Sequence, residues 1–168
     1  MNAGEDPEKR FDRVLEEYGA AFRRLAMSYE HHRDLQQDLF QEIALAVWKA
    51  LPSFRNQSSE RTFLYRIAHN RAINHMSRTR FPYGDVDLAL SIPDPSPNPE
   101  QIASVGADRR ELQKRVAALP IGLRQVVVLA LEGLENDEIA GVLGLSAGNV
   151  AVRLHRAKQR MLAGGSTK

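Results

Sequence analysis

Two runs of basic side chains stand out in a chain of 168 residues whose formal net charge is only +2. The first, from residue 61 to residue 80, holds five arginines and no acid. The second, from residue 145 to residue 160, holds three arginines and one lysine, again with no acid. Clustered guanidinium and ammonium groups bind the phosphates of a polyanion, although a solvated helix face is the alternative for either run alone. Together the runs indicate two separate sites for a polyanion.

No other side chains are spaced for catalysis or metal binding. The chain has no cysteine, so it can form neither a disulfide nor a thiolate zinc site. The five histidines are scattered, and none has an acid at metal-ligand spacing: His31, His32, His69, His75 and His155. A phosphate-binding loop of the G-x-x-x-x-G-K type is also missing from the sequence. We therefore expect no enzymatic activity, no metal and no cofactor.

The composition predicts a cytoplasmic location. A chain without cysteine suits a reducing compartment. Residues 1–10 are polar and charged, so no signal peptide is expected. The longest apolar stretch, Val126 to Leu131, is far too short to cross a bilayer, and we expect no membrane insertion.

Helical periodicity dominates the sequence and predicts an all-α fold. Apolar residues recur at spacings of three and four between residues 11 and 29, and every four residues from Leu35 to Leu51. A third helix is predicted across residues 63–76, with arginines and asparagines on its polar face. Further helices are predicted for residues 112–119, 123–131, 136–143 and 146–161.

A proline-rich segment divides the chain. Five prolines lie between residues 82 and 99, a density that blocks a helix and favours an extended tether. So long a stretch without regular structure is unusual inside one compact domain. We therefore predict two small helical domains, residues 1–80 and 107–168, joined by a linker over residues 81–106.

The second domain contains a helix-turn-helix pattern. Ile139 and Leu143 lie one turn apart, Gly144 supplies the positive φ that ends a helix, and Ser146 can cap the next helix. Val150 then faces inward. A basic second helix held in this way has the geometry that reads a major groove.

This part of the chain resembles region 4 of bacterial sigma factors of the extracytoplasmic-function (ECF) class. The motifs that carry the resemblance are Leu119-Pro120, Glu138-Ile139-Ala140, Leu143-Gly144-Leu145-Ser146 and Arg153-Leu154-His155-Arg156-Ala157. Residues 38–54 (DLFQEIALAVWKALPSF) and 61–78 (RTFLYRIAHNRAINHMSR) are similar to region 2 of the same class. The resemblance implies a sigma factor that binds core RNA polymerase and directs promoter recognition, in a stress or signal response.

Region 2 of this class binds the polymerase clamp and opens the minus-ten promoter element. The resemblance places Asp38, Gln41 and Glu42 on the polymerase-binding surface near Trp48, and their spacing puts the first three on one helix face. A solvated acidic face is the alternative for these residues.

The polar loop at residues 54–59 resembles the segment that captures a flipped base of the melted strand. Asn56, Gln57 and Ser58 would hydrogen-bond that base, and Phe54 is either a stacking surface or a core anchor. The residues implied to follow the phosphates are Arg61, Arg66, Asn70, Arg71, Asn74 and Arg78.

Region 4 of this class reads the minus-thirty-five element as duplex DNA. The residues implied to contact it are Ser146, Asn149, Ala151, Val152, Arg153, His155 and Arg156, with Arg153 and Arg156 as the principal contacts. Ala151 and Val152 stand where the class often has polar or basic residues, which suggests contacts to thymine methyl groups. Glu135 replaces the usual serine cap, so we expect Asn136 to cap that helix instead.

Two other functions remain open. A stand-alone helix-turn-helix regulator would dimerise and bind a palindrome unaided, and a helical adaptor would bind an acidic partner through its basic faces. The arginine run beside a polar loop argues against both, because a regulator needs one DNA-reading domain and an adaptor needs none. The sigma-factor hypothesis predicts a monomer whose partners are core RNA polymerase, promoter DNA and, as is common in the class, an anti-sigma factor.

Overall fold

The computed structural model describes residues 4–80 and 106–164. Within those ranges the chain is helical and has no strand, which confirms the all-α prediction. Of the predicted linker, only Gly106 belongs to the described residues.

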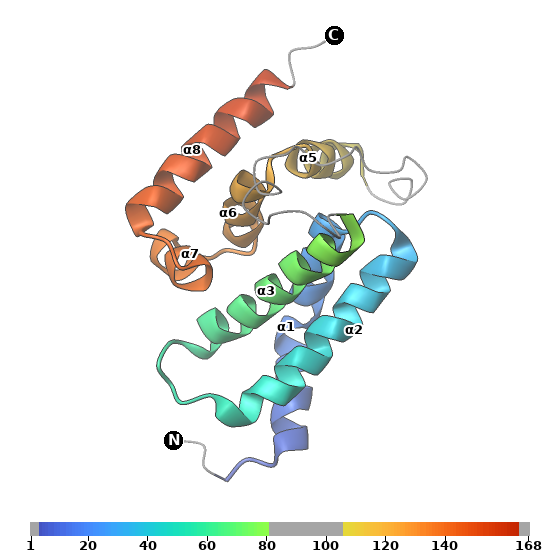
Figure 1. Cartoon of the computed structure of the whole chain (residues 1–168), viewed down its shortest axis with the longest axis vertical. Coiled ribbons are helices and arrows are strands. Elements are labelled where there is room, and N and C mark those ends of the chain that lie inside the picture. Colours follow the sequence, from blue (N-terminus) through green and yellow to red (C-terminus); the bar gives the residue numbers. More distant parts are fainter. Residues whose placement is uncertain (1–3, 81–105, 165–168) are drawn as a thin grey trace.

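The first half of the chain is a bundle of three helices, α1 (Pro7–Tyr29), α2 (Arg33–Ala50) and α3 (Glu60–Arg80). Asp6 caps α1 by accepting a hydrogen bond from the Glu8 amide at 3.1 Å, and Pro7 occupies the first helical position. The three helices lie side by side (Figure 1), and Phe22, Leu39 and Leu64 are fully buried in their common core. A short 3-10 turn, Leu51–Ser53, follows α2 and contains Pro52, which cannot continue an α-helix.

The second half consists of α5 (Ala107–Ala117), α6 (Ile121–Leu131), α7 (Asn136–Leu143) and α8 (Ala147–Ala163). The fully buried Arg124 donates from Nη2 to the carbonyl oxygens of Ala117 at 2.7 Å and Leu119 at 2.9 Å, which ties α6 to the end of α5. Gly144 has φ +69° and ends α7, and the Ser146 hydroxyl accepts from the Asn149 amide at 3.1 Å to cap α8. The predicted helix-turn-helix is therefore present.

The cap of α7 differs from the sequence expectation. Glu135, not Asn136, is the capping residue, and its amide donates to the Glu138 carboxylate at 2.8 Å. The expectation that Asn136 caps this helix was wrong, because a glutamate three residues into the helix reaches back and satisfies the free amide.

The two halves pack against each other, with α7 beside α3 and α5 beside α1 (Figure 1). At the crossing of α3 and α7, a Cβ atom added to Gly141 would lie 3.3 Å from Cγ2 of Thr62. The glycine thus permits a close approach of the two helices.

Candidate nucleic-acid interface

A row of four polar side chains runs along the outer face of α3. Arg66, Asn70, Asn74 and Arg78 follow one another at intervals of four residues, which places them on one side of the helix. Asn70 and Asn74, in the middle of the row, are exposed. Two carboxamides with free hydrogen-bonding edges are thus flanked by two guanidinium groups, while Arg71, beside the row, is half-buried.

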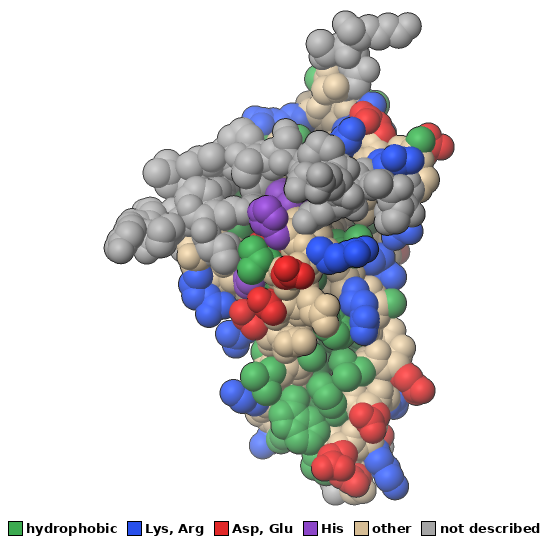
Figure 2. Space-filling model, turned by 90° about the vertical axis from the view of Figure 1, so that its right-hand side faces the viewer, with side chains coloured by type: hydrophobic (Ala, Val, Ile, Leu, Met, Phe, Trp, Pro, Cys, Tyr) green, Lys and Arg blue, Asp and Glu red, His purple; other side chains and the backbone are tan. Residues whose placement is uncertain are grey.

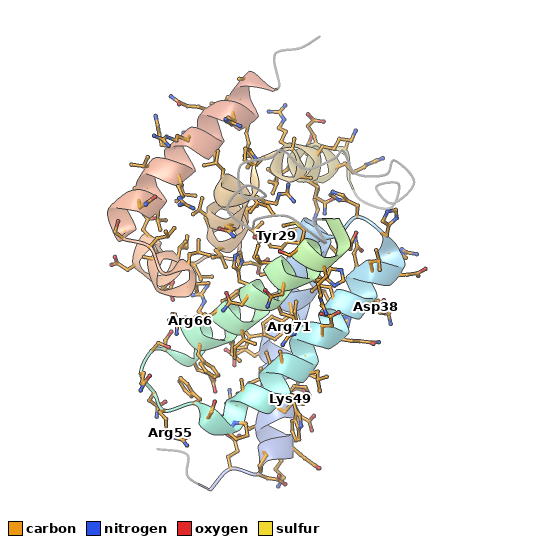
Figure 3. The ribbon with its side chains drawn as sticks, viewed as in Figure 1. Tyr29, Asp38, Lys49, Arg55, Arg66 and Arg71 are labelled. Carbon is orange, nitrogen blue, oxygen red and sulfur yellow. The ribbon has the colours of Figure 1, made fainter. Side chains whose placement is uncertain are left out.

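Both arginines at the ends of the row are held by other parts of the chain. Arg78 Nη2 lies 2.7 Å from Oε2 of Glu42 on α2. Arg66 donates to the carbonyl oxygen of Gly141 on α7, from Nη2 at 2.8 Å and from Nε at 3.3 Å. Figure 3 shows Arg66 on the part of α3 that approaches α7.

Arg61 makes a second set of contacts with the other half of the chain. Its Nη2 donates to the carbonyl oxygen of Glu132 at 3.0 Å, and its Nη1 lies 3.6 Å from Oε1 of Glu138. Glu132 also forms a bidentate ion pair with Arg24 of α1, at 2.8 and 2.7 Å. We call these contacts, together with those of Arg66 and Gly141, the interdomain clamp. Two of the arginines predicted to follow DNA phosphates therefore belong to it.

The loop before α3 presents polar groups to solvent. Asn56 has φ +58°, a left-handed conformation that asparagine tolerates, and Asn56 and Gln57 are both exposed. Ser58 is half-buried, and its hydroxyl lies 3.3 Å from the Ser59 carbonyl oxygen. Ser59 caps α3 by accepting from the Thr62 amide at 3.0 Å, which fixes the loop against the helix.

Phe54 is an anchor of this loop. Its ring packs on Phe63 with centroids 4.7 Å apart, and the Arg10 guanidinium lies 5.6 Å from the Phe54 centroid. Nearby, Glu60 pairs with Arg13 at 3.0 Å and with Arg10 at 3.3 Å, and the Arg13 hydrogen bond holds the Glu60 pKa below its ordinary value. Of the two roles that the sequence left open for Phe54, these contacts favour the core anchor.

The outer face of α2 carries the residues predicted to bind polymerase. Asp38 and Gln41 are exposed, whereas Glu42 is half-buried and paired with Arg78. Trp48 is 37% exposed and meets Phe11 edge-on, with centroids 5.2 Å apart. Leu45, which the sequence analysis missed, is 53% exposed and lies one turn from both Gln41 and Trp48.

Figure 2 shows hydrophobic side chains gathered on the lower part of the side of the molecule that α2 occupies in Figure 1. The face therefore combines an apolar part with polar groups above it. The sequence did offer one signal for Leu45. It is an aliphatic residue that lies outside the apolar repeat of α2, in which apolar residues recur every four positions.

A buried polar cluster holds α3 against the end of α1. The His75 ring lies 3.4 Å from Glu30 and 3.4 Å from Glu42 through its two nitrogens, and both His75 and Glu30 are buried. His69 is buried beside Tyr29, with Nδ1 3.4 Å from the phenol oxygen, and burial lowers the His69 pKa to about 4. These groups set the position of α3 rather than face a ligand.

Helix α8, the second helix of the helix-turn-helix, packs on α6 and α7 with one side and is exposed on the other. Val152 is 50% exposed, and Ala151, His155 and Arg156 are also exposed. Arg153, expected to be a principal DNA contact, is half-buried: its Nε lies 3.0 Å from Asn149 Oδ1, and its Nη1 donates to the Gly122 carbonyl oxygen at 3.3 Å.

Other kinds of site are not evident in the described parts of the chain. No three His, Asp or Glu side chains of residues 4–80 and 106–164 lie close enough to hold a metal ion. None of the described helices is long and apolar enough to span a membrane.

Comparison with protein families gives two matches in chain order. Residues 14–81 match the model of sigma-70 region 2, and residues 109–161 match that of sigma-70 region 4. The chain is 30% identical over 165 residues to the RNA polymerase sigma factor CnrH of Cupriavidus metallidurans, covering 93% of this chain and 86% of that protein. It is 31% identical over 162 residues to the ECF RNA polymerase sigma-E factor of Escherichia coli strain K12, covering 90% of this chain and 84% of that protein.

Solved structures of similar fold exist. CnrH in complex with the cytosolic domain of CnrY has a TM-score of 0.69 and 26% identity, over 98% of this chain and 93% of that chain. The sigma factor RpoE of Bartonella quintana, in complex with the anti-sigma factor NepR, has a TM-score of 0.70, over 91% of this chain and 94% of that chain. Its identity of 22% makes it a likeness of fold alone.

Proposed function

Because this chain belongs to the ECF class of the sigma-70 family of RNA polymerase sigma factors, we propose that three of its surfaces divide the work of initiation. The outer face of α2 binds core polymerase. The outer row of α3, with the loop at residues 54–59, binds the melted minus-ten strand, and α8 reads the minus-thirty-five duplex. In domain terms, residues 1–80 and 107–168 are the two DNA-reading units and residues 81–106 connect them.

The observation that carries the minus-ten assignment is the row along α3. Asn70 and Asn74 are exposed and can hydrogen-bond the edges of unpaired bases, whereas the arginines on either side can bind phosphates. The exposed carboxamides of Asn56 and Gln57 add edge-reading groups at the start of the same helix. A basic face that lacked hydrogen-bonding groups would bind a strand without positioning its bases.

Binding the minus-ten strand requires the interdomain clamp to open. Arg61 and Arg66 donate to carbonyl oxygens of Glu132 and Gly141, so the N–H groups engaged in these bonds are not available to phosphates in the same geometry. We therefore assign the described arrangement to a form of the protein that is not engaged with the promoter.

The α2 face suits a protein partner better than DNA. It combines the exposed Leu45 and Trp48 with the acidic Asp38. An aromatic anchor beside an aliphatic side chain is typical of the centre of a protein interface, and carboxylates repel phosphates.

An anti-sigma factor is a further proposed partner. CnrH was solved with the cytosolic domain of CnrY, and the Bartonella sigma factor with the anti-sigma factor NepR. We propose that an anti-sigma protein restrains this chain in the cytoplasm, where the chain acts as a monomer and leaves polymerisation chemistry to core polymerase.

Transcription in vitro tests the assignment. The full chain with core polymerase should initiate on a subset of genomic fragments, and mapping the start sites gives the two promoter elements. Replacing Asn70 and Asn74 with alanine should lower open-complex formation about tenfold, because each substitution removes a hydrogen bond to a melted base worth about 0.5–1.5 kcal/mol. The matched control replaces Asp12 and Glu16, an exposed pair at the same spacing on α1, and should leave it unchanged.

The stand-alone regulator predicts the opposite pattern. Tight dimeric binding to a palindrome, together with failure to co-purify with core polymerase, would refute the sigma-factor assignment. If initiation occurs but the asparagine pair has no effect, only the placement of the minus-ten contact is wrong.

A further inference from the structure

The centre of the free face of α8 is an aliphatic side chain. Successive residues of an α-helix are rotated by about 100°, so Val152 lies about 200° from Val150 around the helix axis. Val150 and Ala157 are fully buried against the rest of the domain, which fixes the direction of the core. Val152 therefore points almost directly away from the core and is 50% exposed. In Figure 1, α8 lies at the edge of the molecule, on the far side of α6 and α7 from α1–α3.

The surroundings of Val152 leave it accessible to a close partner. One turn earlier is Gly148, where an added Cβ would meet no atom within 4 Å, so packing does not require the glycine. One turn later is Arg156, which is exposed. A cation on one side and a bare backbone on the other allow a polyanion to approach the helix closely at Val152.

The polar side chains nearest the start of the free face are engaged within the protein. Arg153 Nε lies 3.0 Å from Asn149 Oδ1, and Arg153 Nη1 donates to the Gly122 carbonyl oxygen. These contacts draw the Arg153 guanidinium toward α6, away from the direction in which Val152 points. The middle of the free face therefore presents the methyl groups of Val152.

We infer that Val152 is a specificity-determining residue of the minus-thirty-five contact, and that it selects a T·A base pair by packing against the C5-methyl group of thymine. Among the natural bases, only thymine presents a methyl group in the major groove. Thymine also presents the O4 acceptor, but its methyl group covers the C5 side of the edge, where cytosine has only a hydrogen. Guanine and adenine present only polar groups along this edge, and a facing valine would remove water from those groups without replacing it. The inference rests on the proposed function, because it takes α8 to be the helix that enters the major groove.

Removing the methyl group from the DNA tests the inference directly. The holoenzyme is assembled from the full chain and core polymerase, and binding is measured on a promoter from the start-site mapping. Each thymine of the minus-thirty-five element is replaced in turn by deoxyuridine, which lacks only the C5-methyl group. Burial of one methyl group corresponds to about a fourfold change in affinity, so wild type should lose about fourfold at one position.

The Val152→Ala variant should weaken binding to the unmodified promoter by a similar factor and should no longer respond to deoxyuridine at that position. A matched control is Leu162→Ala, which shortens another exposed aliphatic side chain of α8, 62% exposed. This control should bind as wild type does and keep the full response to deoxyuridine. Because Val152 contributes little to the core, and alanine favours a helix more than valine does, the variant should fold.

Three results would overturn the role of Val152 while leaving the sigma-factor function intact. They are a minus-thirty-five element without any T·A pair, a wild-type holoenzyme that ignores deoxyuridine at every position, and a Val152→Ala variant that keeps the wild-type response. Absence of promoter-dependent initiation by wild type would instead refute the proposed function, and this inference with it.

Discussion

The substitution Glu132→Gln should shift the protein toward a form in which the interdomain clamp is open. The Glu132 carboxylate accepts two hydrogen bonds from Arg24 of α1, at 2.8 and 2.7 Å. Glutamine has nearly the same shape but no charge, and its NH2 group replaces one of the two oxygens that accept these bonds. The change leaves Arg61 and Arg66 in place, so it alters the clamp without removing a residue proposed to bind DNA.

The size of the effect follows from the exposure of the pair. Ion pairs at the protein surface contribute about 0.2–1 kcal/mol. The Arg24 side chain is half-exposed, but the Glu132 side chain is only 9% exposed and the geometry is bidentate, which places this pair near the upper end. A loss of about 1 kcal/mol corresponds to a change of about fivefold in the ratio of open to clamped molecules.

The absence of cysteine makes the measurement direct. Cysteines introduced at the exposed positions Lys49 on α2 and Gln159 on α8 can carry a donor and an acceptor dye. Single-molecule energy transfer should show a larger population of long separations in Glu132→Gln than in the parent protein. Added salt should enlarge that population in the parent more than in the variant, because the variant has already lost the screened charge.

A control variant separates the clamp from a general effect of lost charge. Glu111→Gln weakens the ion pair between Glu111 and Arg115 within α5, at 3.1 Å, without touching α1 or α3. It should leave the separations unchanged. If Glu132→Gln folds normally and has the same distribution as the parent at every salt concentration, the ion pair does not stabilise the clamp and the reasoning fails.

Substitutions at capping and buried positions should change stability in a denaturant series. Ser146→Ala should lower the free energy of unfolding by about 1 kcal/mol, since the Asn149 amide loses its acceptor, whereas Ser58→Ala should have little effect. Arg124→Met should cost about 2 kcal/mol, because two carbonyl groups in the interior lose their donor. Burial lowers the pKa of His69 to about 4, below the ordinary value near 6.5, so the unfolded chain binds more protons between these pH values. Wild type should therefore lose up to about 3 kcal/mol as pH falls through that window, and the profile of His69→Gln should be flatter there.

The helices and the turn between α7 and α8 could be predicted because their signals are local. Apolar residues at spacings of three and four report which side of a helix is buried, whatever it packs against. Gly144 and Ser146 act on their own neighbours in the chain, and both take the predicted roles. Asn136 failed as a cap because Glu135 takes that position, with the Glu138 side chain accepting from its amide, and the sequence does not fix the conformation of that side chain.

The partners of the arginines could not be predicted for a different reason. Arg66 and Arg153 donate to the carbonyl oxygens of Gly141 and Gly122. Every residue has a carbonyl oxygen, so no sequence pattern indicates which one an arginine will contact. Arg61 binds a carbonyl oxygen of a residue 71 positions away. The sequence therefore identified the basic faces of α3 and α8 but could not tell which of their cations the rest of the chain already holds.

The clamp has to be weak for the protein to work, and its chemistry agrees with that requirement. Arg66 is exposed and Arg61 half-buried, and the Glu138 carboxylate, 3.6 Å from Arg61, is itself partly exposed to solvent. Each of the two arginines donates to a neutral carbonyl oxygen. Net contributions of such hydrogen bonds are about 1 kcal/mol each. A melted strand offers phosphates to the same guanidinium groups and releases counterions as it binds, so each contact gains in both charge and entropy. Competition for Arg61 and Arg66 thus favours DNA once polymerase holds the strand nearby, whereas free duplex does not present its bases to Asn70 and Asn74.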